Sequence, residues 1–500
     1  MKITIKNHLL IISIFILVGC GSKQLDYWPQ FRGENSQGIA PVSANPPLEL
    51  NLDKNLAWKV PLSSGLSSPC IFEGRIILTG SNPADSSLVT YCIDQHKGSL
   101  LWERTVFPDT LENAHSIGNS AAPTPTTDGS AIYVYFGSYG ALCYDLEGTL
   151  LWEHRLPVLN SQYGNNGSPI LHDSLLIINR MDYDKPSVIA LKSQNGEKVW
   201  ENLLEDVFLG TTKVNLSQAT PIIWRDQVIL HRGLELVSIS LKDGTTKWTT
   251  GIVSTGVGTP IIINDTLFVN GWTNFGDTRL LDVIPDFNVM VEKYDNNKDK
   301  FIAFEEIPSE MAYFRRPELD LPFRLDTLYP VRRFARGFDS NNDLVLGEEE
   351  WKQMQEIQMS YLLEHGVVAL KLDKTGESGK PVLVWTEKDY VAEVPSLVGI
   401  ESRIYMVMNG GNVICMNSRT GEIIFSDRLR ATGAYLASPL SANGYIYFAS
   451  YNGKITVIKP GDKLNIIAQS DLKEKIAASP VALGNILYLR TDSALYAFKN

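Results

Sequence analysis

The chain lacks the features that would point to a nucleic-acid partner or to disorder. No run of lysine or arginine stands out, and the 500 residues carry a net charge of −11 with a pI near 5.3. A nucleic-acid-binding face is basic, so this charge balance argues against nucleic acid as the main partner. Hydrophobic residues make up 44% of the chain and charged residues 20%. That composition is typical of a folded protein with a sizeable core.

Cysteine is scarce and shows no pairing pattern. The five cysteines include no adjacent pair and no Cys-x-x-Cys spacing, which excludes a covalently attached c-type haem. Cys92, Cys143 and Cys415 occupy similar positions in similar apolar segments, and Cys70 also lies in one. We therefore expect these four thiols to be buried on strands.

Beyond the N-terminus, no apolar run is long enough to span a bilayer. The chain starts "MKITIKNHLLIISIFILVGC", in which a basic start precedes the apolar run Leu9–Val18. A run of about ten residues is short for a bilayer span and suits a secretory signal peptide. The end of this segment resembles the bacterial lipobox, which predicts a lipoprotein signal peptide over residues 1–20 and acylation of Cys20, palmitate included. The alternative is an ordinary signal peptide or anchor with an incidental cysteine. Gly21 after the cysteine favours the outer membrane.

A repeat is the most extensive pattern in the sequence. Eight segments of the type "GTPIIINDTLFVN" place a small residue and Pro before two short apolar stretches joined by a turn. Five following segments carry a glycine four residues before an aromatic residue, at Gly98 and Trp102, Gly148 and Trp152, Gly196 and Trp200, Gly244 and Trp248, and Gly421 and Phe425. Units of about 45 residues with four short strands each are typical of a β-propeller. The sequence thus predicts an all-β, eight-bladed propeller.

The two ends of the chain predict how the propeller closes. The strand around Trp58 has no repeat before it, and the strand Ala494–Phe498 has no tryptophan strand after it. Pairing them would complete the eighth blade and leave no exposed sheet edge. The arm would then cover residues 21–55, and the blades residues 56–275 and 366–500.

These repeats resemble the tryptophan-docking units of the pyrroloquinoline-quinone-like propellers. The segments "YWPQFRGENSQGIA" and "AWKVPLSSGLSSPCIFEGRIILTG" are similar to the opening of bacterial exported members. That superfamily holds quinoprotein dehydrogenases, an outer-membrane β-barrel assembly lipoprotein and many members of unknown role. The resemblance implies the fold, and it leaves the function open.

One repeat is interrupted. The distance from Pro260 to Pro395 is 135 residues where the others are near 45, so about 90 residues are inserted. The flanking segments place the insertion, an α-helical domain over residues 280–364, between the second and third strands of the fifth blade.

The insertion contains two segments that match the twelve-residue calcium loop of an EF-hand, "DNNKDKFIAFEE" and "DSNNDLVLGEEE". The matching positions predict two Ca²⁺ sites in an EF-hand pair, with Ile302 and Leu346 pairing as a short bridge. Position 6, usually glycine, is Lys300 or Leu344, at a conformational cost on the order of 1 kcal/mol. The alternative is a pair of polar turns that bind no ion. The predicted ligands are Asp295, Asn297, Asp299, the Phe301 carbonyl and Glu306 in the first loop, and Asp339, Asn341, Asp343, the Val345 carbonyl and Glu350 in the second.

No catalytic residue can be assigned from the sequence. The chain has no adjacent cysteine pair to lie against a quinone, and the quinone-binding residues of the dehydrogenases cannot be placed, so we do not expect pyrroloquinoline quinone as cofactor. A loop with His115, Asn119 and Ser120 is a candidate ligand contact, although solvated loop is the simpler interpretation. Asp182 and Asp184 are interpreted as a polar turn.

The sequence favours a membrane-tethered, exported propeller that binds or scaffolds and does not catalyse. Its expected partners are the membrane, through the lipid, and envelope proteins or an unidentified ligand. The alternative is a periplasmic quinoprotein-like oxidoreductase, or another enzyme that uses the propeller channel.

Overall fold

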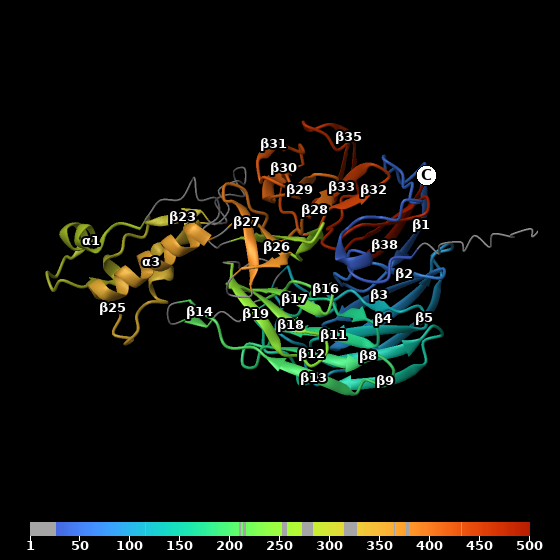
Figure 1. Ribbon diagram of the computed structural model, residues 1–500, viewed down its shortest axis with the longest axis horizontal. Helices are drawn as coiled ribbons and strands as arrows, with labels where there is room; N and C mark the ends of the chain where they lie inside the picture. Colours follow the sequence, from blue (N-terminus) through green and yellow to red (C-terminus); the bar gives the residue numbers. More distant parts are fainter. Residues whose placement is uncertain are drawn as a thin grey trace, which may run out of the picture.

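The structure, a computed structural model, describes residues 27–115, 117–161, 163–209, 212–213, 217–252, 258–272, 284–314, 328–364, 366–376, 380–431 and 433–500. The predicted signal peptide and Cys20 lie outside the described residues. Within the described part, eight four-stranded antiparallel sheets surround a central channel (Figure 1). The predicted all-β, eight-bladed propeller is therefore confirmed.

Each blade runs from an inner first strand to an outer fourth strand. Blades one to four consist of β2 (Cys70–Phe72), β3 (Arg75–Asn82), β4 (Ser87–Asp94) and β5 (Leu100–Val106); β6 (Thr126–Thr127), β7 (Ala131–Phe136), β8 (Gly140–Asp145) and β9 (Leu150–Arg155); β10 (Ile170–His172), β11 (Leu175–Arg180), β12 (Ser187–Lys192) and β13 (Lys198–Leu203); and β16 (Ile222–Trp224), β17 (Gln227–Arg232), β18 (Glu235–Ser240) and β19 (Thr246–Gly251). A short hairpin of β14 (Phe208–Leu209) and β15 (Thr212–Lys213) lies between blades three and four in sequence.

Blades five to eight complete the circle. They consist of β20 (Ile261–Ile263), β21 (Thr266–Gly271), β26 (Gly366–Thr375) and β27 (Pro381–Glu387); β28 (Val398–Ile400), β29 (Arg403–Val407), β30 (Asn412–Asn417) and β31 (Ile423–Arg428); β32 (Leu440–Ala442), β33 (Tyr445–Ala449), β34 (Lys454–Ile458) and β35 (Ile466–Asp471); and β36 (Val481–Leu483), β37 (Ile486–Arg490), β38 (Ala494–Lys499) and β1 (Leu56–Pro61). In blade six, η5 (Asn409–Gly411) joins β29 to β30.

The eighth blade closes the propeller as the sequence predicts. β1 pairs antiparallel with β38, with Trp58 opposite Ala497, so the outer strand of this blade comes from the beginning of the chain. Closure of this kind joins the two ends and leaves no blade without its fourth strand.

Tryptophan rings dock between neighbouring blades. Trp102, Trp152, Trp200 and Trp385 are at most 9% exposed, and each donates its indole N–H to a main-chain carbonyl of the next blade at 2.8–3.1 Å. The glycine under each ring comes from that next blade. At Gly196 an added Cβ would lie 2.4 Å from the Trp152 ring, and Gly196 also has φ of 71°. The glycines therefore give the rings room as well as turning the hairpin.

The aromatic residues of the sequence repeat do not all have the same surroundings in the structure. Trp385 is docked on Gly421, although the sequence pattern did not include it. Trp248 and Phe425 are only partly buried. The glycine of blade five that corresponds in position, two residues before the fourth strand, is Gly379, and it lies outside the described residues. Trp102, Trp152 and Trp200 each follow a glycine in sequence, but each ring docks on the glycine of the following blade.

The N-terminal arm runs along the inside of the channel. Trp28 bridges to Ile71 of blade one, and Ile39 bridges to Ser441 of blade seven. Between them lies a short turn, η1 (Glu34–Ser36). The arm thus contacts the first strands of blades one and seven, which lie on either side of blade eight. The four cysteines in the propeller are buried and free, as predicted.

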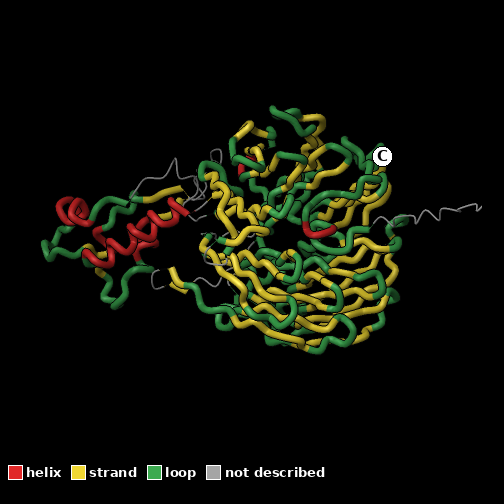
Figure 2. Tube along the Cα trace, in the orientation of Figure 1, coloured by secondary structure: helices red, strands yellow, loops and turns green. Residues whose placement is uncertain are grey.

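The connection between β21 and β26 forms a separate helical lobe, which Figures 1 and 2 show to one side of the propeller. It contains α1 (Phe287–Tyr294), β22 (Ile302–Ala303), η3 (Phe304–Glu306), β23 (Ala312–Phe314), β24 (Leu328–Pro330), α2 (Val331–Ala335), β25 (Val345–Leu346) and α3 (Glu348–Glu364). Ile302 pairs with Leu346, which is the bridge that the sequence predicts between the two loops. The lobe has a core of its own, formed by buried side chains around Trp351 and Met290. Residues 280–283 and 315–327 of the insertion lie outside the described residues.

No helix in the described part of the chain is long and apolar enough to cross a membrane.

Candidate functional site

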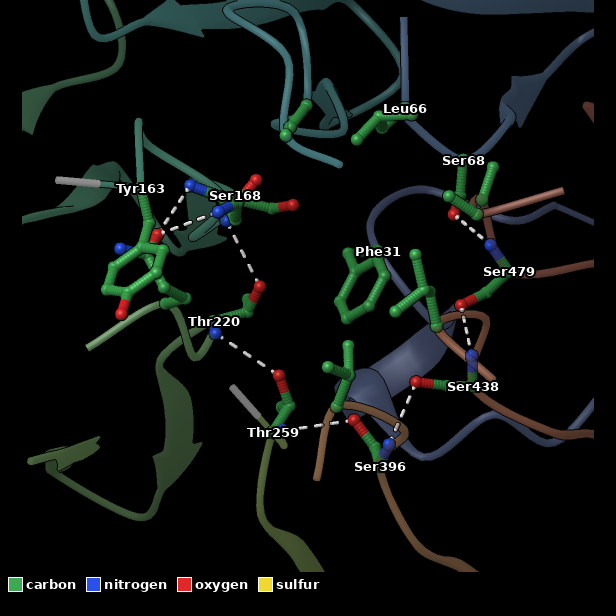
Figure 3. A pocket seen from close by; sticks show the side chains of 18 of the residues that line it. Phe31, Leu66, Ser68, Tyr163, Ser168, Thr220, Thr259, Ser396, Ser438 and Ser479 are labelled. Carbon is green, nitrogen blue, oxygen red and sulfur yellow. Dashed lines mark hydrogen bonds between the residues drawn. The ribbon is translucent and has the colours of Figure 1, made fainter. Parts of the chain in front are cut away.

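A ring of hydroxyl groups surrounds the channel. In every blade a Ser or Thr lies two residues before the first strand. Its main-chain N–H donates to the hydroxyl of the equivalent residue in the next blade at 2.9–3.1 Å. The last of these bonds, from Ser479 to Ser68 at 3.0 Å, closes the circle. Figure 3 shows most of this ring from inside. The hydroxyl ring consists of Ser68, Thr124, Ser168, Thr220, Thr259, Ser396, Ser438 and Ser479.

The sequence contains the signal for this ring. In seven blades the hydroxyl residue directly precedes a proline, which has no N–H to offer and a fixed φ. In blade six the order is reversed, because Ser396 follows Pro395. The repeat was identified from its small residue and proline, but the sequence alone did not indicate that the hydroxyls would join blade to blade.

A cavity of about 310 Å³ lies inside the ring. Seven of the eight ring residues line it, and the Phe31 side chain of the arm projects into its centre (Figure 3). The arm bonds to residues within the first strands, such as Ile71, and so lies further along the channel than the ring residues that precede those strands. Phe31 therefore forms the floor of a pocket whose walls are the ring.

Arg32 fixes the floor in place. This side chain is 2% exposed, and its guanidinium donates to the carbonyls of Ser36 at 3.0 Å, Gln37 at 2.9 Å and Leu397 of blade six. Burial lowers the pKa of Arg32 to about 9, so the group stays charged at neutral pH. The arm is thereby tied to a blade almost opposite its point of entry.

The mouth of the pocket carries aromatic rings and a few polar groups. The rings of His115 and Tyr163 lie 5.6 Å apart, tilted by 39°. The Gln218 side-chain oxygen accepts both the main-chain N–H and the side-chain amide of Asn166 at 3.0 Å. A carboxylate, Glu393, accepts from the Asn409 amide at 2.8 Å.

The insertion leaves the propeller at this same mouth. β20 and β21 are antiparallel, with Ile261 opposite Phe268, so the start of β20 and the end of β21 lie at one edge of blade five. Thr259 of the ring and Trp272, which follows β21, both line the pocket. Trp272 is also 4% exposed, and it is the last described residue before the insertion.

The loop residues singled out in the sequence have different places. His115 lines the pocket. Asn119 accepts the Ser81 hydroxyl at 2.9 Å and donates to Ser64 at 3.1 Å, so it braces the loop, and Ser120 is buried without lining the pocket. Sequence reasoning missed Phe31, Tyr163 and Trp272, which lie far apart in the chain.

The acidic pair in the third blade is a polar turn, as interpreted. Asp182 forms an ion pair with the buried Arg180 at 3.0 Å, and Asp184 accepts the Asn160 amide at 2.8 Å. Neither carboxylate lines the pocket.

The two loops of the insertion have the same internal geometry. Asp295 accepts the N–H of Lys300 at 2.9 Å, and Asp339 accepts that of Leu344 at 3.0 Å. Asn297 and Asn341 each donate to the aspartate two residues later, at 2.7 and 2.8 Å. The equivalence of these bonds means that both sequences wind into one loop conformation.

The last residue of each loop reaches back over it. Glu306 accepts the N–H groups of Asn296 and Ala303, at 2.8 and 2.9 Å. Glu350 accepts those of Ser340 and Gly347, at 2.9 and 3.2 Å. Among the described residues, no three His, Cys, Asp or Glu side chains converge on one point as a metal would require. The loop carboxylates are engaged with the main chain instead.

Position 6 of each loop has the turn that glycine would provide. Lys300 has φ of 65° and Leu344 has φ of 68°, both in the left-handed region. The absence of glycine at these positions therefore does not prevent the turn, although each residue pays roughly 1 kcal/mol for it.

Comparison with known proteins agrees with the architecture. Residues 85–274 match the family model PQQ_2, described as outer membrane protein assembly factor BamB. The propeller is built of PQQ-like repeats. No curated protein matches the chain in sequence.

The PQQ-like propeller also has solved structural counterparts. BamB from Moraxella catarrhalis is 11% identical, with a TM-score of 0.52 over 89% of this chain and 99% of that one. A europium-containing methanol dehydrogenase is 9% identical, with a TM-score of 0.55 over 96% and 99%. Quinohemoprotein alcohol dehydrogenase from Comamonas testosteroni is 10% identical, with a TM-score of 0.53 over 95% and 80%. At these identities the likeness is one of fold alone.

Proposed function

We propose that this chain is an exported, lipid-anchored propeller that binds other molecules of the bacterial envelope without catalysing a reaction. The observation that carries this proposal is the channel pocket. Its wall is a ring of neutral hydroxyls, its floor is a side chain of the chain's own arm, and its mouth bears aromatic rings. Such a site has groups for recognition, and the described part of it contains no paired acid and base.

The alternative is a quinoprotein-like oxidoreductase, which the dehydrogenases among the fold neighbours suggest. Pyrroloquinoline quinone carries several carboxylate groups, which need cationic partners when buried. No lysine or arginine is among the described residues that line the pocket, and Glu393 adds a carboxylate of its own. The pocket residues therefore do not fit this cofactor.

Anchoring and location rest on the N-terminal segment and on the matched family. The lipobox-like end at Cys20 supports lipidation, and several acyl chains on one residue give stable attachment. The description of the matched family as an outer membrane protein assembly factor supports the outer membrane as the location and envelope proteins as partners.

We also propose that the insertion is an EF-hand pair that binds two Ca²⁺ ions. Asp295, Asp299 and Glu306 would hold one ion together with Asn297 and the Phe301 carbonyl. The equivalent residues, Asp339, Asn341, Asp343, the Val345 carbonyl and Glu350, would hold the other. Support comes from the repeated loop geometry, the left-handed position 6 and the bridge between Ile302 and Leu346. Calcium supplies positive charge that offsets the repulsion among the carboxylates of each loop.

Fractionation of bacteria that express the full chain tests the anchoring. We expect the wild type in the detergent phase of a membrane extract, and Cys20→Ala in the aqueous phase. Cys92→Ala is the matched control, because it also removes a cysteine but leaves the N-terminus unchanged. Retention of Cys20→Ala in the detergent phase would contradict lipid anchoring.

A dye-reduction assay tests the non-catalytic part. The purified protein is incubated with pyrroloquinoline quinone, calcium, a primary alcohol and an artificial electron acceptor. We expect no reduction of the dye above the protein-free rate. Reduction that depends on both the quinone and the alcohol would favour the oxidoreductase.

A further inference from the structure

The hydroxyl ring leaves hydrogen-bonding capacity directed at the cavity. A hydroxyl has one donor and two acceptor lone pairs, and here one lone pair accepts an N–H from the preceding blade. Among the described residues no acceptor lies within hydrogen-bonding distance of the proton of any ring hydroxyl. Those that line the cavity are at most 7% exposed. Each of them can therefore offer one donor and one acceptor to whatever fills the pocket.

The charge of the residues that line the pocket limits the charge of the ligands that it can bind. Because no lysine or arginine is among the lining residues, a buried anion would have no counter-charge. Glu393 at the mouth disfavours an anion further. Its hydrogen bond from Asn409 fixes the carboxylate, which remains an acceptor for ligand O–H groups.

The aromatic side chains add apolar surface between these polar groups. Phe31 lies at the centre of the ring, Tyr163 stands beside His115 at the mouth, and Trp272 lines the wall (Figure 3 for Phe31 and Tyr163). A ligand that suits the pocket therefore has faces of C–H groups as well as groups that donate and accept hydrogen bonds. An anion would find no cationic side chain among the described lining residues, and a wholly apolar ligand would leave the ring hydroxyls without hydrogen bonds.

We infer that the pocket binds the end of a neutral saccharide. Sugar hydroxyls both donate and accept, which complements the ring, and the C–H faces of a pyranose can lie against the aromatic rings. The volume of about 310 Å³ is at the small end of ligand pockets, which span about 300–1,000 Å³, and it suits one or two sugar rings. This inference rests on the proposed binding function and specifies its ligand class.

Titration calorimetry of the mature protein with three trisaccharides of different charge tests the inference. The probes are maltotriose, which is neutral, chitosan trimer, which is cationic, and trigalacturonate, which is anionic; trialanine serves as a peptide probe. We expect maltotriose to bind, and the anionic trimer to give no heat. Tyr163→Ala should weaken maltotriose binding about tenfold, the effect of losing one aromatic contact. Phe107→Ala, an exposed ring that does not line the pocket, should leave it unchanged.

Two results would overturn the saccharide assignment. One is the absence of heat with maltotriose, and the other is binding that Tyr163→Ala and Phe107→Ala alter equally. If the cationic trimer binds with a Tyr163-dependent affinity and maltotriose does not, the neutral charge of the ligand is wrong; if only trialanine does so, the saccharide is wrong. In both cases the proposed binding function stands. Quinone-dependent dye reduction in the separate assay would instead contradict the proposed function itself.

Discussion

Trp152 and Trp351 are both buried, but their surroundings differ in kind. Trp152 lies between two blades, with its indole N–H on the Ser193 carbonyl and its ring against Gly196. The same arrangement recurs at other blade interfaces. Trp351 lies in the single core of the insertion, where its indole donates to the Pro285 carbonyl at 2.9 Å. The propeller repeats the same kind of packing at several blade interfaces around its circle, whereas the insertion has a single small core.

This difference indicates where each part gets its stability. Every blade is joined to its two neighbours by a hydroxyl bond, and several interfaces also carry a docked ring, so the propeller is held together by its own side chains. The insertion combines a small core with two loops that each have three carboxylates among their predicted ligands. A small core supplies little net stability, so the domain gains from any ion that its loops bind. The comparison therefore predicts a propeller that is insensitive to calcium and an insertion that depends on it.

The largest expected effect comes from removing a docked ring. Trp152→Ala should lower the free energy of unfolding by about 3–5 kcal/mol, because a large buried side chain is lost and its cavity cannot close. Trp248→Ala is the matched control. Its ring is only partly buried, so its cost should be clearly smaller. Urea unfolding followed by fluorescence measures both. Equal costs would mean that the extent of burial of the ring does not set its contribution.

A buried carboxyl in the propeller gives the next largest effect. Burial raises the pKa of Glu112 from its ordinary value of 4.5 to about 7. As the pH rises, Glu112 therefore ionises in the unfolded chain before it ionises in the folded protein. The stability that the protonated, buried Glu112 contributes is fully present below pH 4.5 and is lost as the pH rises to about 7. The loss is worth about 3 kcal/mol. Glu112→Gln should remove it from the pH dependence of thermal unfolding.

Glu147→Gln provides the control for this pH effect. Its side chain is 72% exposed and lies in the neighbouring hairpin turn of blade two. This variant should retain the wild-type fall in stability between pH 4.5 and 7. If Glu112→Gln retains the same fall, another group causes the pH dependence.

The smallest expected effect is on calcium binding by the insertion. Lys300 holds a left-handed conformation that costs roughly 1 kcal/mol, and glycine adopts it freely. Lys300→Gly should therefore tighten calcium binding about fivefold in titration calorimetry. Lys298→Gly is a useful comparison, since Lys298 also has positive φ but lies at position 4. No change with Lys300→Gly would mean that the strain does not oppose binding.

Most of the fold could be predicted because each repeat unit carries its own short residue pattern. A small residue, a proline and a glycine recur at fixed spacing, and each suits the local backbone conformation at its position. The partner of each tryptophan could not be predicted in the same way, because Trp102 meets Gly148 of the next blade and not its own Gly98. Trp385 was missed because Pro381 lies four residues before it, and the nearest preceding glycine, Gly379, is six residues away.

The pocket could not be predicted, for a physical reason. Phe31, Tyr163 and Trp272 come from the arm, from a loop between blades and from the start of the insertion. Only closure of the propeller brings them together. The two loops of the insertion could be located in the sequence because their predicted ligands are close together in the chain. The residues of the hydroxyl ring and Phe31 are brought together only by the tertiary structure. His115 was found because it belongs to a polar loop that precedes a first strand.

Scanning calorimetry with and without a calcium chelator tests the central comparison most directly. The wild type in calcium should show a transition for the propeller and one for the insertion. A chelator should abolish or lower the second and leave the first unchanged. The double variant Glu306→Gln, Glu350→Gln should behave in calcium as the wild type does in chelator. A wild type whose transitions are both unaffected by chelation, or a propeller transition that falls with the insertion, would contradict the account.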